Sequence, residues 1–176
     1  MIRNLLIKIG LIEFLKIELD VNKLKFFEIF RNNVDGSQSL IFDLFSSSKN
    51  QYKGTVNIDG FQINHKLNFF DSNRSFVDLT GSIEQKDNKL LIETEINAFS
   101  RLISINIIMI FVIYLVILIS YITIKIKGIA ADLGIPFIII SLIFLFLFLI
   151  SYLFMKRSVT KIKYEFERDL YFMTKK

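Results

Sequence analysis

The sequence predicts an α+β protein: a small antiparallel β-rich domain with an amino-terminal helix, followed by a transmembrane helical hairpin and an amphipathic carboxy-terminal helix. Three observations predict this class. Two long runs contain no charged residue, the stretch before them alternates apolar and polar residues, and the stretch after them carries apolar residues at helical spacing. The expected organisation is an α+β domain over residues 1–100, the hairpin over residues 101–155 and a basic tail over residues 156–176.

The two uncharged runs are residues 102–124 and 135–155. A helix of about 20 residues crosses the roughly 30 Å hydrocarbon core of a bilayer. Pro136 falls at the start of the second run, where its missing N–H costs nothing, and Gly128 and Gly134 bracket the turn between the runs. These features predict a helical hairpin that spans a membrane.

The distribution of charge predicts the orientation of the hairpin. Residues 156–176 contain seven basic against three acidic residues, whereas Lys125 and Lys127 are the only basic residues between the runs. By the positive-inside bias, both termini are expected in the cytoplasm. Glu13 and Lys16 interrupt the apolar start of the chain, so we expect no signal that exports the front domain. The expected location is the cell inner (plasma) membrane.

The start of the chain fits two secondary structures. Within residues 5–30, the alternation of Ile7, Ile9 and Leu11 indicates a strand, but apolar residues from Leu11 onward, including Phe14 and Leu15, also fit one face of a helix. We favour a short strand followed by a helix. Asn22 is expected to cap a further helical stretch that packs on a sheet, with a membrane-surface or partner-binding helix as the alternative. The apolar side of that stretch consists of Leu24, Phe27 and Phe30.

Two β-hairpins are expected in the rest of the front domain. Asp59-Gly60 stands between alternating runs, and glycine accepts the positive φ of a tight turn. Residues 86–89 separate a second pair of runs. Four antiparallel strands with one buried face can hold a helix from the start of the chain. In the last strand the buried face consists of Leu90, Ile92, Thr94 and Ile96.

A short connection joins the last strand to the first apolar run, so we expect the domain to lie against the membrane. Phe99 and Arg101 then reach headgroup depth, where an aromatic ring and a snorkelling guanidinium are stable. Lys156 and Arg157 occupy the matching position after the second run. These four residues form the predicted membrane interface.

The tail predicts an amphipathic helix. Its pairs Lys161–Glu165 and Lys163–Glu167 are four residues apart, as in ion pairs along a helix. Its apolar stripe can pack on the front domain, lie on anionic lipid or contact another protein, and the sequence leaves these three interpretations open. The stripe consists of Val159, Ile162, Phe166, Leu170 and Met173.

Four short motifs precede the apolar runs, namely Tyr52-Lys-Gly54, Gly60-Phe61-Gln-Ile63, Asn73-Arg-Ser-Phe76 and Gly81-Ser-Ile83. With the two runs, this pattern resembles a group of small uncharacterised bacterial two-span membrane proteins with an amino-terminal β-rich cytoplasmic domain. The resemblance covers residues 50–110. It implies a bacterial cytoplasmic membrane and carries no activity that could be transferred to this chain.

Residues able to perform catalysis are few. The chain has no cysteine and a single histidine, His65, which argues against thiolate chemistry and a zinc site. His65 shares a strand phase with Ile63, which indicates a hydrogen-bonded structural residue rather than a base. Glu93 and Glu95 lie on the polar face of a strand, so a solvated surface explains them better than a catalytic pair. We expect no catalytic, metal-binding or cofactor-binding residue.

Arg74 is the strongest candidate for contact with an anion or a partner. It lies in a polar loop with Ser72 and Ser75, and a guanidinium with two hydroxyls can hold an anion. The alternative is an ion pair with Asp71 or Asp78. Basic residues of the front domain are balanced by acids, which argues against a nucleic-acid partner.

The expected function is that of a non-enzymatic, membrane-anchored interaction protein that binds a protein or a lipid headgroup at the inner membrane surface. The alternative is an oligomeric channel or an accessory subunit of a membrane transport complex. The runs lack the ionisable groups of carriers and any GxxxG motif, which favours an anchor. A third hypothesis is an immunity-type protein that neutralises a toxin at the membrane. The expected partners are membrane lipid and either a protein or further copies of the chain.

Overall fold

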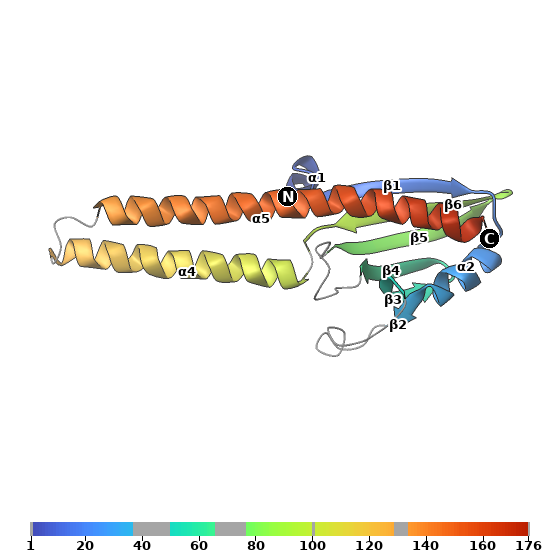
Figure 1. Ribbon diagram of the computed structural model, residues 1–176, viewed down its shortest axis with the longest axis horizontal. Helices are drawn as coiled ribbons and strands as arrows, with labels where there is room; N and C mark the ends of the chain where they lie inside the picture. The colour runs from blue at the N-terminus through green and yellow to red at the C-terminus, as the bar shows by residue number, and fades with distance from the viewer. Residues whose placement is uncertain (1, 37–49, 66–76, 100, 129–133, 176) are drawn as a thin grey trace. The chain divides into compact units, whose positions relative to one another are not determined.

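The computed structural model describes residues 2–36, 50–65, 77–99, 101–128 and 134–175. The chain divides into two compact units. We call residues 1–100 with residues 155–176 the head, and residues 101–154 the helical pair. The elements in chain order (Figure 1) are α1 (Ile2–Lys8), β1 (Ile12–Leu19), α2 (Lys23–Asn32), β2 (Val34–Gly36), β3 (Tyr52–Asn57), β4 (Gly60–His65), β5 (Asp78–Lys86), β6 (Lys89–Asn97), α4 (Arg101–Ile126) and α5 (Gly134–Thr174).

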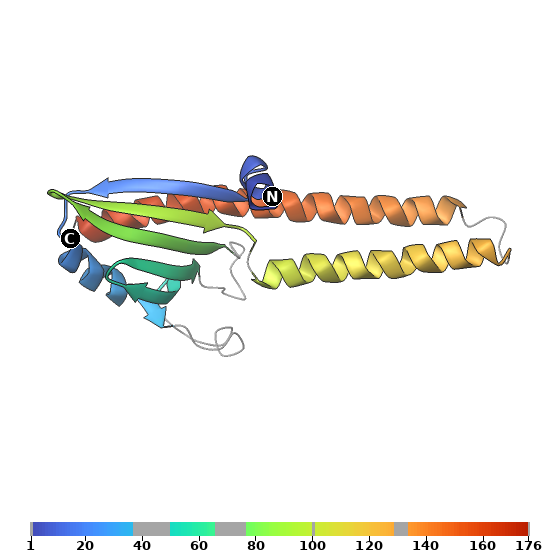
Figure 2. The ribbon, with the colours of Figure 1, turned by 180° about the vertical axis from the view of Figure 1, so that it is seen from behind.

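The described strands of the head form one six-stranded sheet in the order β1-β6-β5-β4-β3-β2. Its pairs are antiparallel except for β2 and β3, which run parallel. The two predicted hairpins, β3–β4 and β5–β6, are confirmed. Figure 2 shows β1 beside β6, where it forms one edge of the sheet. The sequence did not predict a strand at this edge. The α+β class with an amino-terminal helix is therefore confirmed, with a larger sheet than expected.

The first thirty residues fold differently from our expectation. Ile7, predicted in a strand, lies in α1, whereas Phe14 and Leu15, predicted in a helix, lie in β1. Gly10 separates the two elements with a φ of 75°, a conformation that favours glycine. Pairing with β6 along the whole of β1 outweighs the local helical spacing, because cross-strand contacts and burial decide strand formation.

Helix α2 begins where predicted but buries a different face. The side chain of Asn22 accepts a 2.8 Å hydrogen bond from the N–H of Leu24, which confirms the cap. Phe26 and Phe30, one turn apart, are the buried residues of the helix, and Leu24 is 60% exposed. The prediction of Leu24 and Phe27 as inward residues is therefore wrong. The rings of Phe26 and Phe30 stack at 5.3 Å and fix the inward face instead.

Gly60 is required in the β3–β4 hairpin for a reason other than the predicted one. The φ of Gly60 is not positive, unlike the φ angles of Gly10, Gly54 and Gly128. A Cβ on Gly60 would instead lie 2.6 Å from the carbonyl oxygen of Gly81, so the close approach of β5 demands glycine.

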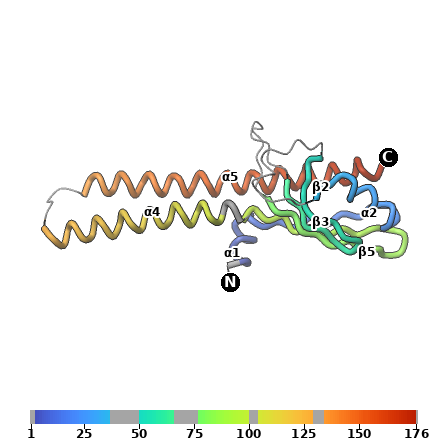
Figure 3. Tube along the Cα trace, turned by 90° about the horizontal axis from the view of Figure 1, so that it is seen from below, coloured from blue at the N-terminus to red at the C-terminus, as the bar shows by residue number. Residues whose placement is uncertain are grey.

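The core of the head lies between one face of the sheet and two helices. Figure 3 shows α2 and the last turns of α5 on the same side of the sheet. The ring of Phe166 on α5 contacts Phe30 of α2, Tyr52 of β3 and Phe61 of β4. The carboxy-terminal segment of α5 therefore completes a core that the sheet and α2 begin.

This packing selects one of the three interpretations of the tail. The predicted stripe faces the sheet, with Val159, Ile162, Phe166 and Leu170 buried. Lys161 pairs with Glu165 at 3.7 Å, as predicted. Lys163 pairs instead with Glu13 of β1 at 2.9 Å, so the predicted Lys163–Glu167 pair is wrong. Glu13 of the sheet therefore takes the place of Glu167 as the partner of the Lys163 ammonium.

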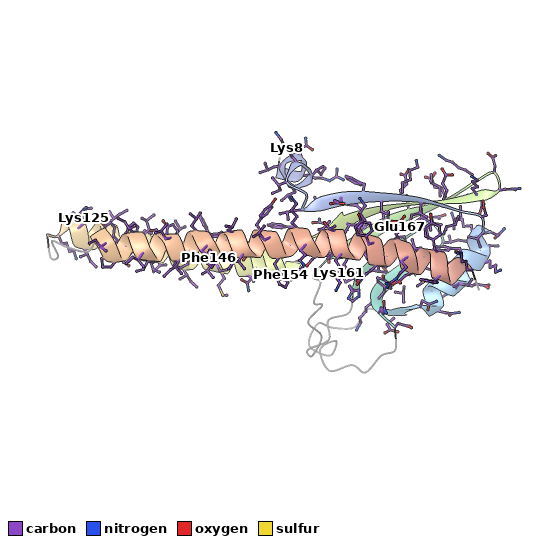
Figure 4. All side chains as sticks on the ribbon, turned by 45° about the horizontal axis from the view of Figure 1, so that its top comes forward. Lys8, Lys125, Phe146, Phe154, Lys161 and Glu167 are labelled. Carbon is purple, nitrogen blue, oxygen red and sulfur yellow. The ribbon has the colours of Figure 1, made fainter. Side chains whose placement is uncertain are left out.

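The helical pair consists of α4 and the amino-terminal part of α5. Both helices are long and apolar enough to cross a membrane, over residues 104–126 and within α5. Pro136 lies in the first turn of α5, as expected. Aromatic rings join the helices, with Tyr121 and Phe137 stacked at 4.0 Å and Tyr114 and Phe144 at 5.3 Å. Figure 4 shows apolar side chains such as Phe146 extending outward from α5.

Candidate functional site

The predicted anion-contact residues Arg74, Ser72 and Ser75 lie outside the described residues, as does Asp71. Asp78, the alternative partner of Arg74, begins β5. The candidate site is therefore built from the other predicted surface, where the head joins the helical pair along the chain.

The chain leaves the head from a fastened strand end. Ala98 is 1% exposed, and its N–H donates a 2.9 Å hydrogen bond to the carbonyl oxygen of Leu11. The side chain of Asn97 accepts a 2.8 Å bond from the N–H of Phe99, which is half-buried. Helix α4 begins at Arg101, whose side chain lies outside the described part. Residues 98–100 are thus the whole connection between β6 and α4.

The chain returns to the head at the same place. Met155 is buried, and Lys156 and Arg157, which follow it on α5, are exposed. A Cβ on Gly10 would lie 3.6 Å from Cε of Lys156. The turn formed by Gly10 and Leu11 is therefore flanked both by the strand that leads into α4 and by the residue at which α5 enters the head.

Helix α1 ends at this turn in a Schellman motif. The N–H of Leu11 donates to the carbonyl of Leu6 at 2.9 Å, and the N–H of Gly10 donates to the carbonyl of Ile7 at 3.1 Å. The side chain of Leu6 is half-buried, whereas Leu5 is 57% and Ile7 37% exposed. The helix therefore has an inner side on β1 and two flanks on which Leu5 and Ile7 are exposed, with the exposed Lys8 between them.

Sequence reasoning missed α1 as part of this surface because it predicted a strand there. The signal was present in Lys8-Ile9-Gly10-Leu11, where a basic residue in the last turn precedes a glycine and an apolar residue. On β1, Phe14 is 53% exposed, and the guanidinium of Arg3 lies 6.0 Å from the centre of its ring. Phe14 thus adds an exposed aromatic ring on β1, next to Arg3 of α1.

The charge of this surface is positive. Arg3 is neutralised by Glu95, with Nη2 2.7 Å from Oε2. Lys8, Lys156 and Arg157 have no ion pair within the part of the chain that the structure describes. We call the surface of Leu5, Ile7, Lys8, Phe14, Lys156 and Arg157 the basic-apolar edge.

The opposite end of the sheet, at the β5–β6 turn, has a different charge pattern. There Lys23 pairs with Asp59 at 2.6 Å, and Lys89 lies 3.6 Å from Glu18. These basic residues are paired with acids, in contrast to Lys8, Lys156 and Arg157 at the basic-apolar edge.

The remaining candidate residues have structural surroundings. His65 ends β4, half-buried on the same face as Ile63, with its ring 5.7 Å from that of Tyr52. Glu93 and Glu95 lie on the open face of the sheet, as predicted. Glu93 accepts from Lys16 at 3.0 Å, and this hydrogen bond, followed by the carboxylate charge, raises the pKa of the Lys16 ammonium.

The function cannot be assigned from a metal centre among the described residues or from similarity to a known protein. Within the described ranges, no group of three or more His, Cys, Asp and Glu side chains is arranged to hold a metal ion. Comparisons with family models, with curated proteins and with solved structures found no match for the chain. Function is therefore argued from the two units themselves.

Proposed function

We propose that the chain is a non-enzymatic, membrane-anchored interaction protein of a bacterial inner (plasma) membrane. In this proposal α4 and the amino-terminal part of α5 cross the bilayer, both termini are cytoplasmic, and the head binds a protein or a lipid headgroup at the membrane surface. One observation carries it: the end of α5 completes the core of the head, so residues before and after the helical pair form one folded unit.

This shared core supports a hairpin by an argument independent of charge. Residues 1–100 and 155–176 pack together, so they fold in the same compartment. An apolar segment between them that enters a membrane must therefore return to the side from which it came. Two helices long enough to span a bilayer satisfy that requirement, because each crosses once. The bias of basic residues toward the tail favours the cytoplasmic side for the head.

The contacts of the helical pair favour an anchor over a channel lining. Tyr114 and Tyr121 of α4 contact aromatic rings of α5 within one chain. Ser120 donates to the carbonyl of Val116 and Ser151 to that of Leu147, whereas the buried hydroxyl of Ser141 has no partner among the described residues. The Ser120 and Ser151 hydroxyls are satisfied within their own helices and do not require a water-filled path.

Cysteine labelling tests this topology directly, because the natural chain has no cysteine. Lys25→Cys on α2, Tyr164→Cys on α5 and Lys127→Cys after α4 place single thiols at exposed positions. With a membrane-impermeant maleimide, we expect the first two to react only in inverted vesicles and Lys127→Cys to react only from the opposite side. Reaction of Lys25→Cys and Tyr164→Cys from opposite sides, or release of the protein by alkaline carbonate, would refute the proposal.

A second measurement separates the anchor from the oligomeric alternative. The mass of the protein in a mild detergent gives its oligomeric state. A monomer that retains a bound protein or lipid supports the interaction protein. A stable ring of copies without any other component supports the channel or accessory subunit instead.

A further inference from the structure

We propose that the basic-apolar edge docks on anionic phospholipid, so that α1 forms a third membrane contact beside the two crossing helices. The inference rests on the proposed function, since it requires a membrane at the end of the head where the chain enters α4 and where α5 returns to the head. It specifies the lipid class and the surface that binds it. Figure 4 shows Lys8 on α1, which stands out from the sheet.

The apolar residues of the edge are positioned outward by the fold of the head itself. Leu11 and Ile12 are each 3% exposed, although Ile12 lies on the open face of β1, and α1 packs against this strand. Leu6 is half-buried on this inner side, and Leu5 and Ile7, each about 100° from Leu6 around the helix, are exposed on the two flanks of α1, with Lys8 between them. A helix of this length is marginal by itself, so an apolar environment for its exposed Leu5 and Ile7 side chains stabilises it.

The basic residues of the edge favour anionic lipid over a neutral surface. Lys8, Lys156 and Arg157 are exposed and have no acidic partner among the described residues, whereas Arg3 is held by Glu95. Each basic residue near an anionic membrane surface strengthens binding by about fivefold. Apolar side chains flanked by such cations are typical of segments that lie in the headgroup region.

Chain connectivity makes lipid, rather than a protein, the expected occupant. Residues 98–100 connect β6 to α4, and three residues extend over at most about 10 Å. Lys156 follows the helical pair by two positions and lies beside Gly10. In the proposed topology the head is therefore tethered to the bilayer by a three-residue connection, and such tethering makes a weak intrinsic affinity sufficient.

The absence of tryptophan from the chain provides a clean test. Leu5→Trp places a fluorophore on the edge, and Leu24→Trp places one on α2 at a site of nearly equal exposure, 60% against 57%. Leu24 lies at the other end of the sheet, because the neighbouring Lys23 contacts Gln85 and Asp59. Both full-length variants are reconstituted in phosphatidylcholine vesicles with and without phosphatidylglycerol, and quenching by bromine-labelled acyl chains is measured.

We expect strong quenching and a blue-shifted emission for Leu5→Trp in vesicles containing phosphatidylglycerol, and neither effect for Leu24→Trp. Lys8→Glu should lower the ratio of docked to undocked edge by about fivefold or more, and high salt should act in the same direction. Lys25→Glu, the same charge reversal on α2, is the matched control and should leave the quenching unchanged.

The outcomes separate this inference from the proposed function. If Leu5→Trp stays unquenched while the protein resists extraction by carbonate, the edge does not dock and the anchor remains. Equal quenching of Leu5→Trp and Leu24→Trp, or quenching unaffected by phosphatidylglycerol and by Lys8→Glu, overturns the inference as well. Extraction by carbonate refutes the anchor itself. Ile7→Trp, at a second exposed position of α1, repeats the test if Leu5→Trp does not fold.

Discussion

The hydroxyl of Tyr52 donates a 2.8 Å hydrogen bond to Oδ2 of Asp169, which joins β3 to the last turns of α5 across 117 positions of the sequence. The ring of Tyr52 is 2% exposed and contacts the ring of Phe166. This single bond therefore connects the front of the chain to the segment that follows the helical pair. The bond adds to the ring contacts of Phe166 and to the Lys163–Glu13 pair in holding α5 on the head.

Replacing Tyr52 by Phe should remove this bond and keep the ring. A hydrogen bond to a charged group contributes about 1.5–3 kcal/mol, so we expect the free energy of unfolding of the head to fall by about that amount. The measurement is chemical unfolding of the full chain in detergent, followed by circular dichroism. Tyr171→Phe on the same helix, at a 43% exposed site, is the control and should be nearly neutral. A neutral Tyr52→Phe would contradict this role.

The same pair predicts a dependence on pH. Burial, and then the charge and hydrogen bond of Asp169, raise the pKa of Tyr52 above its ordinary value of 10.0. Above pH 10 the unfolded chain loses the Tyr52 proton, while the folded chain keeps it. The contribution of Tyr52 to the free energy of unfolding is therefore complete below pH 10 and declines as the pH rises above 10. The difference in unfolding free energy between the natural chain and Tyr52→Phe should therefore shrink by about 1.4 kcal/mol per pH unit there. A constant difference between about pH 8 and pH 11 would exclude this linkage.

Phe166 is expected to be the most sensitive position of the tail. Its side chain is fully buried and contacts rings on α2, β3 and β4. Phe166→Ala should lower the free energy of unfolding by about 3–5 kcal/mol through the cavity that it leaves. Phe172→Ala removes the same atoms from a 64% exposed site of the same helix and should change it by less than about 0.5 kcal/mol. Resistance of the head to trypsin reports the difference, and equal resistance of the two variants would show that the tail is dispensable.

Much of the fold was predictable because its signals are local. The hairpins around Asp59-Gly60 and residues 86–89, the cap at Asn22 and the apolar stripe of the tail each follow from spacing and turn chemistry. Strands β1 and β2, outside the two hairpins, were not predictable in the same way. Strand β1 forms through pairing with β6, far along the chain, and its phase is disturbed at Ile12, which is buried on the open face. Only the tertiary structure supplies that burial.

The candidate site was less predictable than the fold. The sequence indicated Phe99, Lys156 and Arg157 by their position beside the apolar runs, and it indicated the end of α1 through Gly10, but it did not indicate that α1 lies beside them. What brings α1 to them is the bond from Ala98 to Leu11 and the approach of Lys156 to Gly10. Neither interaction leaves a pattern in the sequence, because each joins segments that are remote along the chain.

Thr94 shows how a predicted core residue can oppose stability. It lies on the buried face of β6, as expected, with 2% exposure, and its hydroxyl has no hydrogen-bond partner within the described residues. A buried hydroxyl without a partner costs about 1–3 kcal/mol. Thr94→Val, which keeps the shape, should therefore raise the unfolding free energy by about 1 kcal/mol or more. Thr80→Val on the exposed face of β5 is the control, and a destabilised Thr94→Val would indicate that the hydroxyl is satisfied.

Gly54 and Gly36 are directly paired in β3 and β2, yet they should differ sharply in their tolerance of a side chain. Gly54 has a φ of +154°, and an added Cβ would lie 2.7 Å from Cα of Ile63 on the neighbouring strand. At Gly36 no atom of the described residues lies within 4 Å of an added Cβ. Gly54→Ala must displace backbone at the centre of the β3–β4 hairpin, which should cost at least about 1–3 kcal/mol of unfolding free energy.

Gly36→Ala should change the unfolding free energy by less than about 0.5 kcal/mol, because the methyl group meets open space and glycine loses more chain entropy on folding than alanine does. Thermal unfolding of both variants, under identical detergent conditions, measures the contrast. Gly36 ends the edge strand β2, whereas Gly54 lies in β3, which is paired on both sides, so the contrast measures the close approach of β4 to Gly54. Equal melting temperatures would mean that β3 can shift away from β4 at Gly54 without loss of the pairing that positions Tyr52 against Asp169.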